Sequence, residues 1–245
     1  MHFELFVVNP HNETYDGDFS QREVAWLRAG APDKAEHIQR LLAGTAVGSV
    51  LEVGCGTGAV LAELVRRNIG QQHVGIDMTN PHDHLDPAAL TAGLEFLQYD
   101  GSRIPFPDRH FDLVYATHVV EHVPDPRGFL AELKRVAKRF VFTEVPCELH
   151  WRASRDALQR TLAIGHINAY TPESYQLLLQ TAGLSPVRSG LYDHCLAVHA
   201  FHGSPVASRV KKMIRGGLLS LSPQMASRCF TYHYAVMCEV GNSPN

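Results

Sequence analysis

The sequence predicts an α/β fold in which a mostly parallel sheet carries helices on both faces. Short apolar segments alternate with stretches of helical periodicity, and they span residues 49–53, 72–77, 94–99, 111–116 and 139–144. Such alternation is typical of crossover units between parallel strands, and right-handed crossovers place helices on both faces of the sheet. A glycine-rich turn after the first segment and a carboxylate at the end of the second indicate the same architecture.

The first 48 residues are predicted to form a helical cap ahead of the first strand. Ser20 is a candidate helix N-cap because Glu23 stands three residues later, and this helix is expected to run through Leu27. A second helix is expected after Pro32, where apolar residues fall on one face, and it is expected to end at Gly44.

Residues 49–145 are expected to form the core. The strand at 49–53 passes through Gly-Cys-Gly-Thr-Gly, residues 54–58, into a helix with apolar residues at helical spacing. Further helices are expected at 87–92 and from Pro126 to Val136, because proline suits the first turn of a helix. The fifth strand is expected to stop before Pro146.

The C-terminal part is predicted to complete the sheet. Residues 146–185 are expected to be irregular and partly helical, ending in a helix from Pro172 to Ala182 that Thr171 caps. The region 186–245 is expected to contain a sixth strand at 187–200, a basic helix at 205–216 and a final strand at 230–240. No repeat or linker divides the chain, so residues 1–245 are predicted to form a single domain.

The ends of the first three strands carry residues that suit a nucleoside. Glycines at 54, 56 and 58 allow tight dihedral angles and a close approach of a ligand to the backbone. Asp77 follows about 20 residues later, where a carboxylate can accept hydrogen bonds from both hydroxyls of a ribose. Asp100 ends the third strand, where it can accept a hydrogen bond from an adenine amino group. The alternative is that both aspartates only cap their strands.

Residues 49–145 resemble the class I S-adenosylmethionine (SAM)-dependent methyltransferases. The resemblance rests on VLEVGCGTG, VGIDM and LQYDGSRIPFPDRHFDLVYATHVVEHVPDPRGFLAELKRV. It implies a Rossmann-like, doubly wound sheet of seven strands with an antiparallel last strand, and SAM as the cofactor. The stretches EHVPDP and GHINAYTPESYQLLLQTAGL are similar to small-molecule methyltransferases of the ubiquinone-biosynthesis-like and natural-product type.

The resemblance also implies which residues contact SAM. It places the methionine moiety near the glycine turn, the ribose at the end of the second strand and the adenine at the end of the third. The implied contacts are Glu52, Gly54 and Gly56 with the methionine moiety, Asp77 with the ribose, Asp100 and Gly101 with the adenine, and Thr117 and His118 facing the cofactor; Cys55, Gly58, Met78 and Ser102 complete the predicted set.

The sequence differs from the dinucleotide-binding loop at one place and from the usual pattern of the methyltransferase family at another, and both differences bear on this interpretation. A dinucleotide-binding loop usually reads Gly-x-Gly-x-x-Gly around a phosphate, whereas the third glycine here comes one residue early. SAM carries no phosphate, so the shorter loop favours SAM. The family often has a Lys-Pro-Gly-Gly turn before the fifth strand, and here residues 137–139 lead directly into it. This difference changes the sheet edge and not the cofactor site.

Three histidines are candidates for chemistry at the methyl acceptor. A hydroxyl acceptor benefits from a general base, and histidine suits this role near neutral pH. His166 in the 146–185 insertion and His118 after the fourth strand are the predicted catalytic residues. A loop-ordering contact with Asn168 or Tyr170 is the alternative for His166, and His122 is expected to have a packing role.

Two other patterns are interpreted as structural. His82, Asp83 and His84 have a spacing that metal ligands can use, but a third ligand is not evident nearby, so a solvated loop without metal is predicted. The basic residues Arg209, Lys211, Lys212 and Arg215 lie on a helix with Val206, Val210, Met213 and Ile214. An amphipathic helix on the sheet is predicted there, with a membrane-surface or anionic-acceptor role as the alternative.

The predicted function is methylation of a small molecule, most readily at oxygen. A formal net charge of -3 provides no overall basic field for nucleic acid, and no apolar run reaches the roughly 20 residues that span a bilayer. Scattered cysteines and the absence of a signal-like start predict a cytoplasmic protein without stable membrane insertion, and a homodimer is conceivable. The alternatives are a non-catalytic SAM-binding module and a methyltransferase of protein or RNA.

Overall fold

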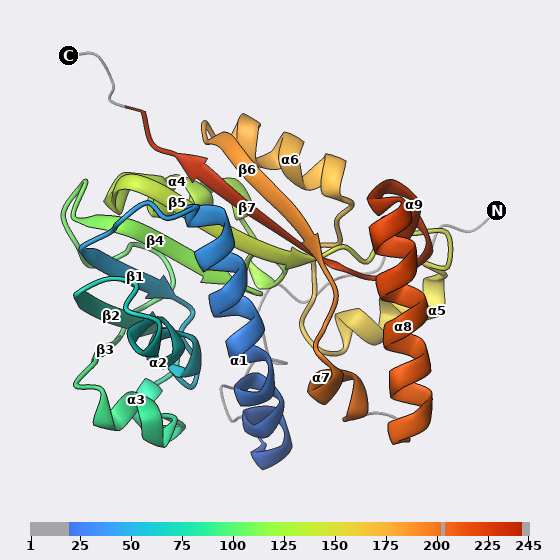
Figure 1. The fold of residues 1–245 in the computed structure, drawn as a ribbon. Helices are drawn as coiled ribbons and strands as arrows, with labels where there is room; N and C mark the ends of the chain where they lie inside the picture. The colour runs from blue at the N-terminus through green and yellow to red at the C-terminus, as the bar shows by residue number, and fades with distance from the viewer. Residues whose placement is uncertain (1–19, 202–203, 242–245) are drawn as a thin grey trace, which may run out of the picture.

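The computed structural model describes residues 20–201 and 204–241, which form a seven-stranded sheet (Figure 1). The strand order is β3-β2-β1-β4-β5-β7-β6. Strands β1 to β5 pair in parallel, and β7 pairs antiparallel with β5 and β6. The strands are β1 Ser49–Val53, β2 Gln72–Asp77, β3 Glu95–Gln98, β4 Phe111–Thr117, β5 Ala137–Pro146, β6 Ser185–Tyr192 and β7 His233–Glu239. The predicted fold class is confirmed.

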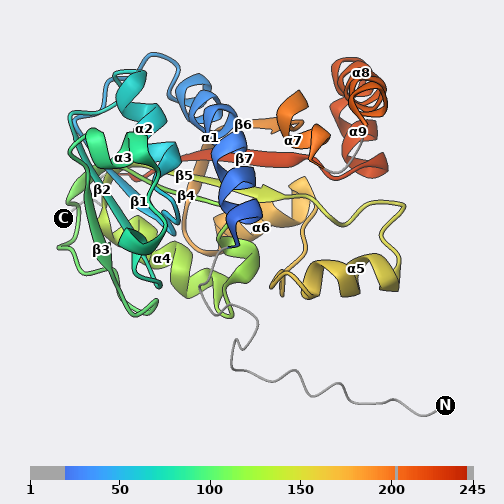
Figure 2. The same cartoon turned by 90° about the horizontal axis from the view of Figure 1, so that it is seen from below.

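Helices cover both faces of this sheet. Figure 2 shows α1 and α2 on one face and α4 and α6 on the other, and each face has its own buried apolar cluster. The helices are α1 Gln21–Leu42, α2 Ala59–Arg66, α3 Pro87–Thr91, α4 Pro126–Val136, α5 Arg155–Leu162, α6 Pro172–Thr181, α7 Leu196–Ala200, α8 Pro205–Leu221 and α9 Pro223–Cys229, with 3-10 turns η1 Pro81–Asp83 and η2 Val120–His122. Among the described residues, none of these helices is long and apolar enough to cross a bilayer.

The N-terminal part of the described chain is one continuous helix. The prediction of two helices is wrong, because α1 runs from Gln21 to Leu42 with Pro32 inside it. The missing N–H of an interior proline costs about 3 kcal/mol, and burial of an apolar stripe next to it offsets this cost. The stripe consists of Ala31, Ala35, Ile38, Leu41 and Leu42. The predicted capping box of Ser20 and Glu23 is present at the start of the helix.

The C-terminal elements differ from the prediction in two places. The sixth strand stops at Tyr192 instead of continuing to residue 200, because Asp193 leaves the sheet to pair with Arg215 at 2.7 Å. Helix α7 follows, and α9 is a further short helix that the sequence pattern does not predict. Helix α6 begins where predicted, with its N-cap Thr171 accepting a hydrogen bond from the N–H of Ser174.

Helix α8 does not lie on the sheet, so the prediction of a helix buried on the sheet is wrong. Figures 1 and 2 show α8 and α9 next to the start of β7, beside the sheet. Arg215, one of the four basic residues of this helix, points inward and is buried against Asp193. The apolar stripe of the helix is exposed and consists of Val206, Val210, Met213, Ile214 and Leu221.

Replacement of Gly54 by alanine tests how closely the glycine turn is packed. Gly54 has a φ of 78°, and an added Cβ would lie 2.5 Å from Cγ2 of Val119. Gly44 has the same φ of 78°, but its added Cβ meets nothing within 4 Å. We expect Gly44→Ala to lower the free energy of unfolding by about 1–2 kcal/mol through backbone strain alone. Gly54→Ala should cost about 1–3 kcal/mol more through overpacking.

Urea unfolding of both variants at one pH measures this difference. Adding Val119→Ala to Gly54→Ala removes the methyl groups that the new Cβ would meet, so the double variant should lose less stability than the two single losses combined. Equal losses for Gly44→Ala and Gly54→Ala would contradict the close packing of the turn.

Candidate active site

The glycine turn of residues 54–58 lies at the carboxyl ends of the parallel strands. The N–H groups of Gly54 and Cys55 donate to the carbonyl of Ile76 at 2.8 and 3.1 Å, which holds the turn against β2. Gly54, Gly56 and Gly58 have φ values of 78°, 48° and 67°. The turn therefore uses the left-handed conformations that glycine adopts without strain. The chain reverses its strand order between β1 and β4, so the turn sits at the switch point where open α/β sheets bind ligands.

Asp77 ties this turn to the end of β2. Its Oδ2 accepts a hydrogen bond from the N–H of Gly56 at 2.8 Å, and its Oδ1 accepts hydrogen bonds from the N–H and the hydroxyl of Thr79, each at 3.1 Å. The side chain is buried, so these bonds hold it in one orientation. A carboxylate accepts up to about four hydrogen bonds, which leaves Asp77 capacity for a ligand hydroxyl.

The end of β3 lies beside Asp77 and forms an exposed platform. Asp100 Oδ1 accepts hydrogen bonds from the N–H and the hydroxyl of Ser102, and the first of these holds the pKa of Asp100 below its usual value. Burial raises the pKa of Tyr99 to about 12, and the negative charges of Asp77 and Asp100 raise it in the same direction. Met78 is exposed, and a Cβ at Gly101 would lie 2.7 Å from its sulfur.

Glu52 places a buried carboxyl group behind the glycine turn. It lies in β1 and is 2% exposed. Burial raises its pKa to about 8, and this effect outweighs the opposing influence of Tyr115 and Lys34. The side chain of Lys34 on α1 is also buried, and burial lowers its pKa. The site therefore holds a carboxyl group that is mostly protonated at neutral pH and that a bound cation would ionise.

Thr117 ends β4 and His118 follows it in a strained conformation. His118 has a φ of 58°, in the left-handed region that favours glycine, and its N–H donates to the carbonyl of Glu144 at 2.9 Å. Its Nδ1 lies 3.2 Å from Oε1 of Glu121, and its Nε2 lies 3.4 Å from Oε1 of Glu144. Burial and Lys34 lower the pKa of His118, but the two glutamates outweigh them and raise it.

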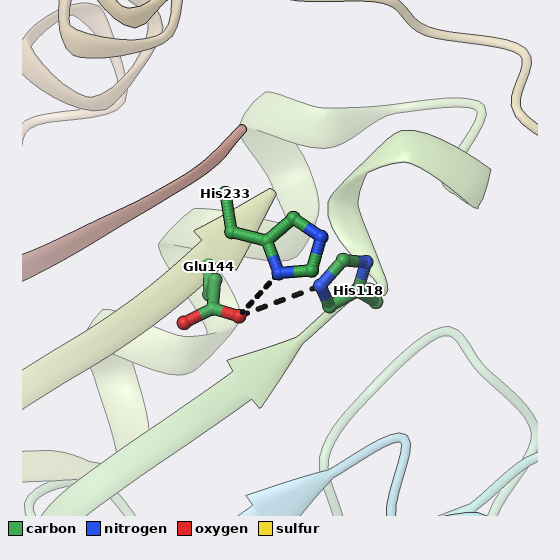
Figure 3. A group of neighbouring side chains, drawn as sticks. All are labelled: His118, Glu144 and His233. Carbon is green, nitrogen blue, oxygen red and sulfur yellow. Dashed lines mark ion pairs between the residues drawn. The ribbon is translucent and has the colours of Figure 1, made fainter. Parts of the chain in front are cut away.

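Glu144 is the centre of a buried polar cluster at the end of β5. Figure 3 shows His118 and His233 directed at the same carboxylate oxygen, and His233 Nδ1 lies 3.3 Å from it. His37 on α1 contacts the other oxygen through Nδ1 at 2.6 Å. Burial alone would raise the pKa of Glu144, but the three histidines hold it well below its usual value. His194 Nε2 lies 3.1 Å from Nε2 of His233 and extends the cluster.

His166 lies on the segment that follows α5 and is held by Glu148. Its Nδ1 lies 3.0 and 3.1 Å from the two oxygens of the Glu148 carboxylate. The segment is joined to η2, because His122 Nδ1 lies 3.0 Å from the carbonyl of Gly165 and Asn168 donates to the carbonyl of Val123 at 2.8 Å. The ring of His166 therefore stands against the turn that follows His118, although the two residues are far apart in the sequence.

The structure brings most of the predicted residues to one edge of the sheet, and it adds others. The glycine turn, Asp77 and Asp100 share the edge with Thr117 and His118, and His82 and Asp83 lie in the 3-10 turn η1. The ring of His166 contacts Glu148, and not Asn168 or Tyr170, the partners named in the alternative interpretation. The residues that sequence reasoning missed are His37, Glu121, Glu144, Glu148, His194 and His233. Glu144 alone gave a signal, as an acidic residue at the end of an apolar strand.

Comparison with known proteins identifies the family. The methyltransferase-domain family matches residues 26–189, which is more than half of the chain, so the chain belongs to this family. The predicted class, a SAM-dependent methyltransferase domain of class I, is confirmed, as is SAM as its cofactor. The individual contacts to SAM stay predictions.

Three similar proteins illustrate the relationship. The chain is 35% identical over 97 residues to a sterol 24-C-methyltransferase of Gibberella zeae, covering 36% of this chain and 24% of that protein. It is 35% identical over 114 residues to a probable tocopherol O-methyltransferase of Oryza sativa, covering 44% and 29%. The chain thus matches only about a quarter to a third of the length of these curated relatives. The structure of a methyltransferase-like protein of Bacillus halodurans has the same fold, with a TM-score of 0.59, 17% identity and coverage of 86% of this chain and 100% of that chain.

Replacement of Asp77 by alanine tests the predicted ribose contact. We expect Asp77→Ala to weaken SAM binding roughly tenfold or more, because a hydrogen bond to a charged group contributes about 1.5–3 kcal/mol. Titration calorimetry measures the affinity. Circular dichroism checks that the loss of the hydrogen bond between Asp77 and the glycine turn has not unfolded the protein. Asp83→Ala is the matched control, since Asp83 is exposed and also follows β2. Unchanged affinity in Asp77→Ala would contradict the assignment.

The raised pKa of Glu52 predicts a pH dependence of SAM binding. SAM carries positive charge in its methionine moiety, and the predicted contact places this moiety beside Glu52. The positive charge favours the ionised form of the Glu52 carboxyl group. Because the pKa of Glu52 in the protein without SAM is about 8, its carboxyl group must lose a proton when SAM binds at pH 6. SAM affinity should therefore rise as the pH increases from 6 to 8, by at most about tenfold per pH unit.

Calorimetry of the wild type and Glu52→Gln in several buffers measures this effect. The variant cannot lose the proton, so its affinity should change less between pH 6 and 8. Wild type should also release protons on binding, seen as a dependence of the heat on the buffer. Identical pH profiles for the two proteins would show that Glu52 does not contact the cation.

Proposed function

We propose that this chain transfers the methyl group of SAM to an oxygen atom of a small-molecule acceptor. The observation that carries this proposal is the pair of His166 and Glu148 on the segment beside the carboxyl edge of the sheet. The names of two similar proteins, a sterol 24-C-methyltransferase and a probable tocopherol O-methyltransferase, support a small and largely apolar acceptor, and the second of them supports oxygen as the methylated atom. The net charge of -3 gives no general attraction for nucleic acid.

The His166–Glu148 pair suits the removal of a proton from a hydroxyl group. Because Glu148 holds Nδ1 of the ring, the N–H is on that nitrogen and Nε2 is left with a lone pair. A carboxylate that fixes the tautomer and stabilises the protonated ring is the arrangement that makes histidine an effective base. Both side chains are largely buried, at 12% and 10% exposure, so little water competes for the proton.

Apart from removal of the proton, the reaction requires mainly that the acceptor oxygen be held in line with the methyl group of SAM. SAM supplies a methyl group on a positively charged sulfur, which leaves as a neutral thioether when the acceptor oxygen attacks. The glycine turn and Asp77 hold the nucleoside end in place, while the segment carrying His166 brings the acceptor oxygen in line with the methyl group. His166 Nε2 takes the proton of the hydroxyl group as the new carbon–oxygen bond forms.

The role of His166 is tested by replacing it with glutamine. A general base contributes about 10²–10⁴-fold to the rate, so we expect His166→Gln to lower turnover by this factor while SAM affinity stays within about twofold. Transfer of a radiolabelled methyl group from SAM to a panel of phenols and hydroxylated isoprenoids measures turnover, and mass spectrometry with NMR identifies the methylated atom.

The matched control is His150→Gln. His150 lies on the same insertion, where its Nε2 contacts the hydroxyl of Thr231 at 3.2 Å, so this variant should keep its activity. Glu148→Gln should reduce turnover less than His166→Gln, because it loosens the ring without removing it. Methylation at carbon, or equal losses of turnover and SAM affinity in His166→Gln, would overturn the proposal.

A further inference from the structure

Three side chains at the end of β5 have the geometry of a metal site. His118 follows β4, Glu144 lies in β5 and His233 begins β7, so three neighbouring strands each contribute one residue. Their ligand atoms all lie within 4.8 Å of one another. Figure 3 shows the two imidazole rings converging on one oxygen of Glu144 from different sides.

The distances between the atoms match those around a small divalent ion. His118 Nε2 and His233 Nδ1 lie 3.4 and 3.3 Å from Glu144 Oε1. Ligand atoms bound about 2.1 Å from a tetrahedral ion lie about 3.4 Å from one another. Both separations are longer than good hydrogen bonds, which lie near 2.9 Å. The two histidine nitrogens therefore lie at the distances from Glu144 Oε1 that ligands of a common ion would have.

Two of the three ligand atoms have no other partner. His118 Nε2 and Glu144 Oε1 are buried and make no hydrogen bond to any part of the chain that the structure describes. A buried carboxylate oxygen without a hydrogen bond destabilises the folded state, so such atoms call for an explanation. A cation between the atoms would satisfy both of them.

Each ligand is also held from behind by a second group. Glu121 Oε1 lies 3.2 Å from Nδ1 of His118, an ion-pair contact without a hydrogen bond, and this leaves Nε2 facing the site. His194 contacts Nε2 of His233 at 3.1 Å, which leaves Nδ1 facing the site. His37 contacts the other oxygen of Glu144 at 2.6 Å. Metal-binding histidines almost always have such a supporting partner on the remote nitrogen.

We propose that His118, Glu144 and His233 bind one divalent transition-metal ion of the first row. Two imidazoles and one carboxylate suit Zn²⁺, Fe²⁺, Co²⁺ or Mn²⁺ and are poor ligands for Mg²⁺ or Ca²⁺, which prefer oxygen. Three protein ligands leave the ion a position for water or for an acceptor oxygen. That last use of the site rests on the proposed function, whereas binding of the ion itself does not.

A second group in the same region is less well suited to hold the ion. Glu121, His122 and His166 also lie close enough to share a metal. In this group, however, Glu121 already faces Nδ1 of His118, and His166 belongs to the segment after α5 rather than to a strand. The strand-borne group is the more rigid of the two, and rigid placement is what a metal site requires.

Metal content of the full-length protein tests the proposal. The protein is treated with a chelator, dialysed against Zn²⁺ or Co²⁺, passed over a desalting column and analysed by plasma mass spectrometry. We expect about one ion per chain in the wild type and less than about one tenth of that in Glu144→Gln and His233→Asn. The Co²⁺ form should show visible absorption bands typical of nitrogen and oxygen ligands, and these should disappear in both variants.

Two further variants keep the test decisive if a ligand variant unfolds. Glu121→Gln leaves the three ligands in place and removes one support, so the metal dissociation constant should rise about 10–100-fold without loss of the folded circular dichroism spectrum. His199→Asn is the matched control, because His199 is buried against Asp193 at 3.2 Å and belongs to neither group. It should bind metal as the wild type does.

The outcome separates this inference from the proposed function. No metal retained by the wild type, or one ion still bound by Glu144→Gln and His233→Asn, would overturn the site. Methyl transfer is measured separately on chelated and Zn²⁺-loaded protein, with SAM affinity from calorimetry. Failure of transfer with one ion bound would count against the proposed function alone, and transfer by a protein that never binds metal would count against the ion alone.

Discussion

A fully buried carboxylate cannot stay charged without partners, and Glu144 is such a group at the heart of this fold. Its partners come from helix α1, from the turn after β4 and from the start of β7, so one charge draws together three separate regions of the chain. The antiparallel placement of β7 beside β5 is what brings His233 within reach. The polar cluster around Glu144 therefore depends on the order of the strands in the sheet.

The same sheet edge is divided between two tasks. The ends of β1, β2 and β3 carry the glycine turn, Asp77 and Asp100, whose backbone and carboxylate groups suit a nucleoside. The ends of β4 and β5 carry imidazole and carboxylate groups that suit proton or metal chemistry. Glu52 lies in β1, beside β4, so its buried carboxyl group stands where these two regions meet.

The sequence predicts the first region well because its signals are local. A strand, a glycine turn and an acidic residue follow one another within a short stretch, and parallel strands align their ends automatically. The cluster around Glu144 could not be predicted, because His37 and His233 are separated by most of the chain and neither has a distinctive neighbour. Likewise, Pro32 predicts a break in a helix, and only the buried stripe beside it explains why α1 continues. The aromatic residues Tyr15, Phe19 and Trp26 near the N-terminus predict a lid over the cofactor, with coverage of the apolar core as the alternative. Tyr15 and Phe19 lie outside the described residues, so the lid stays a prediction.

The position of β7 has a consequence for how the molecule is completed during synthesis. Among the strands that the structure describes, it is the last in sequence order, yet it lies between β5 and β6 in the sheet. On the ribosome, β6 therefore has no neighbour to pair with until the final strand emerges, and the apolar edge of β5 stays open for the same time. Closure of the sheet and delivery of His233 to Glu144 happen in one late event, so a chain shortened before residue 233 has neither an intact sheet nor a complete polar centre.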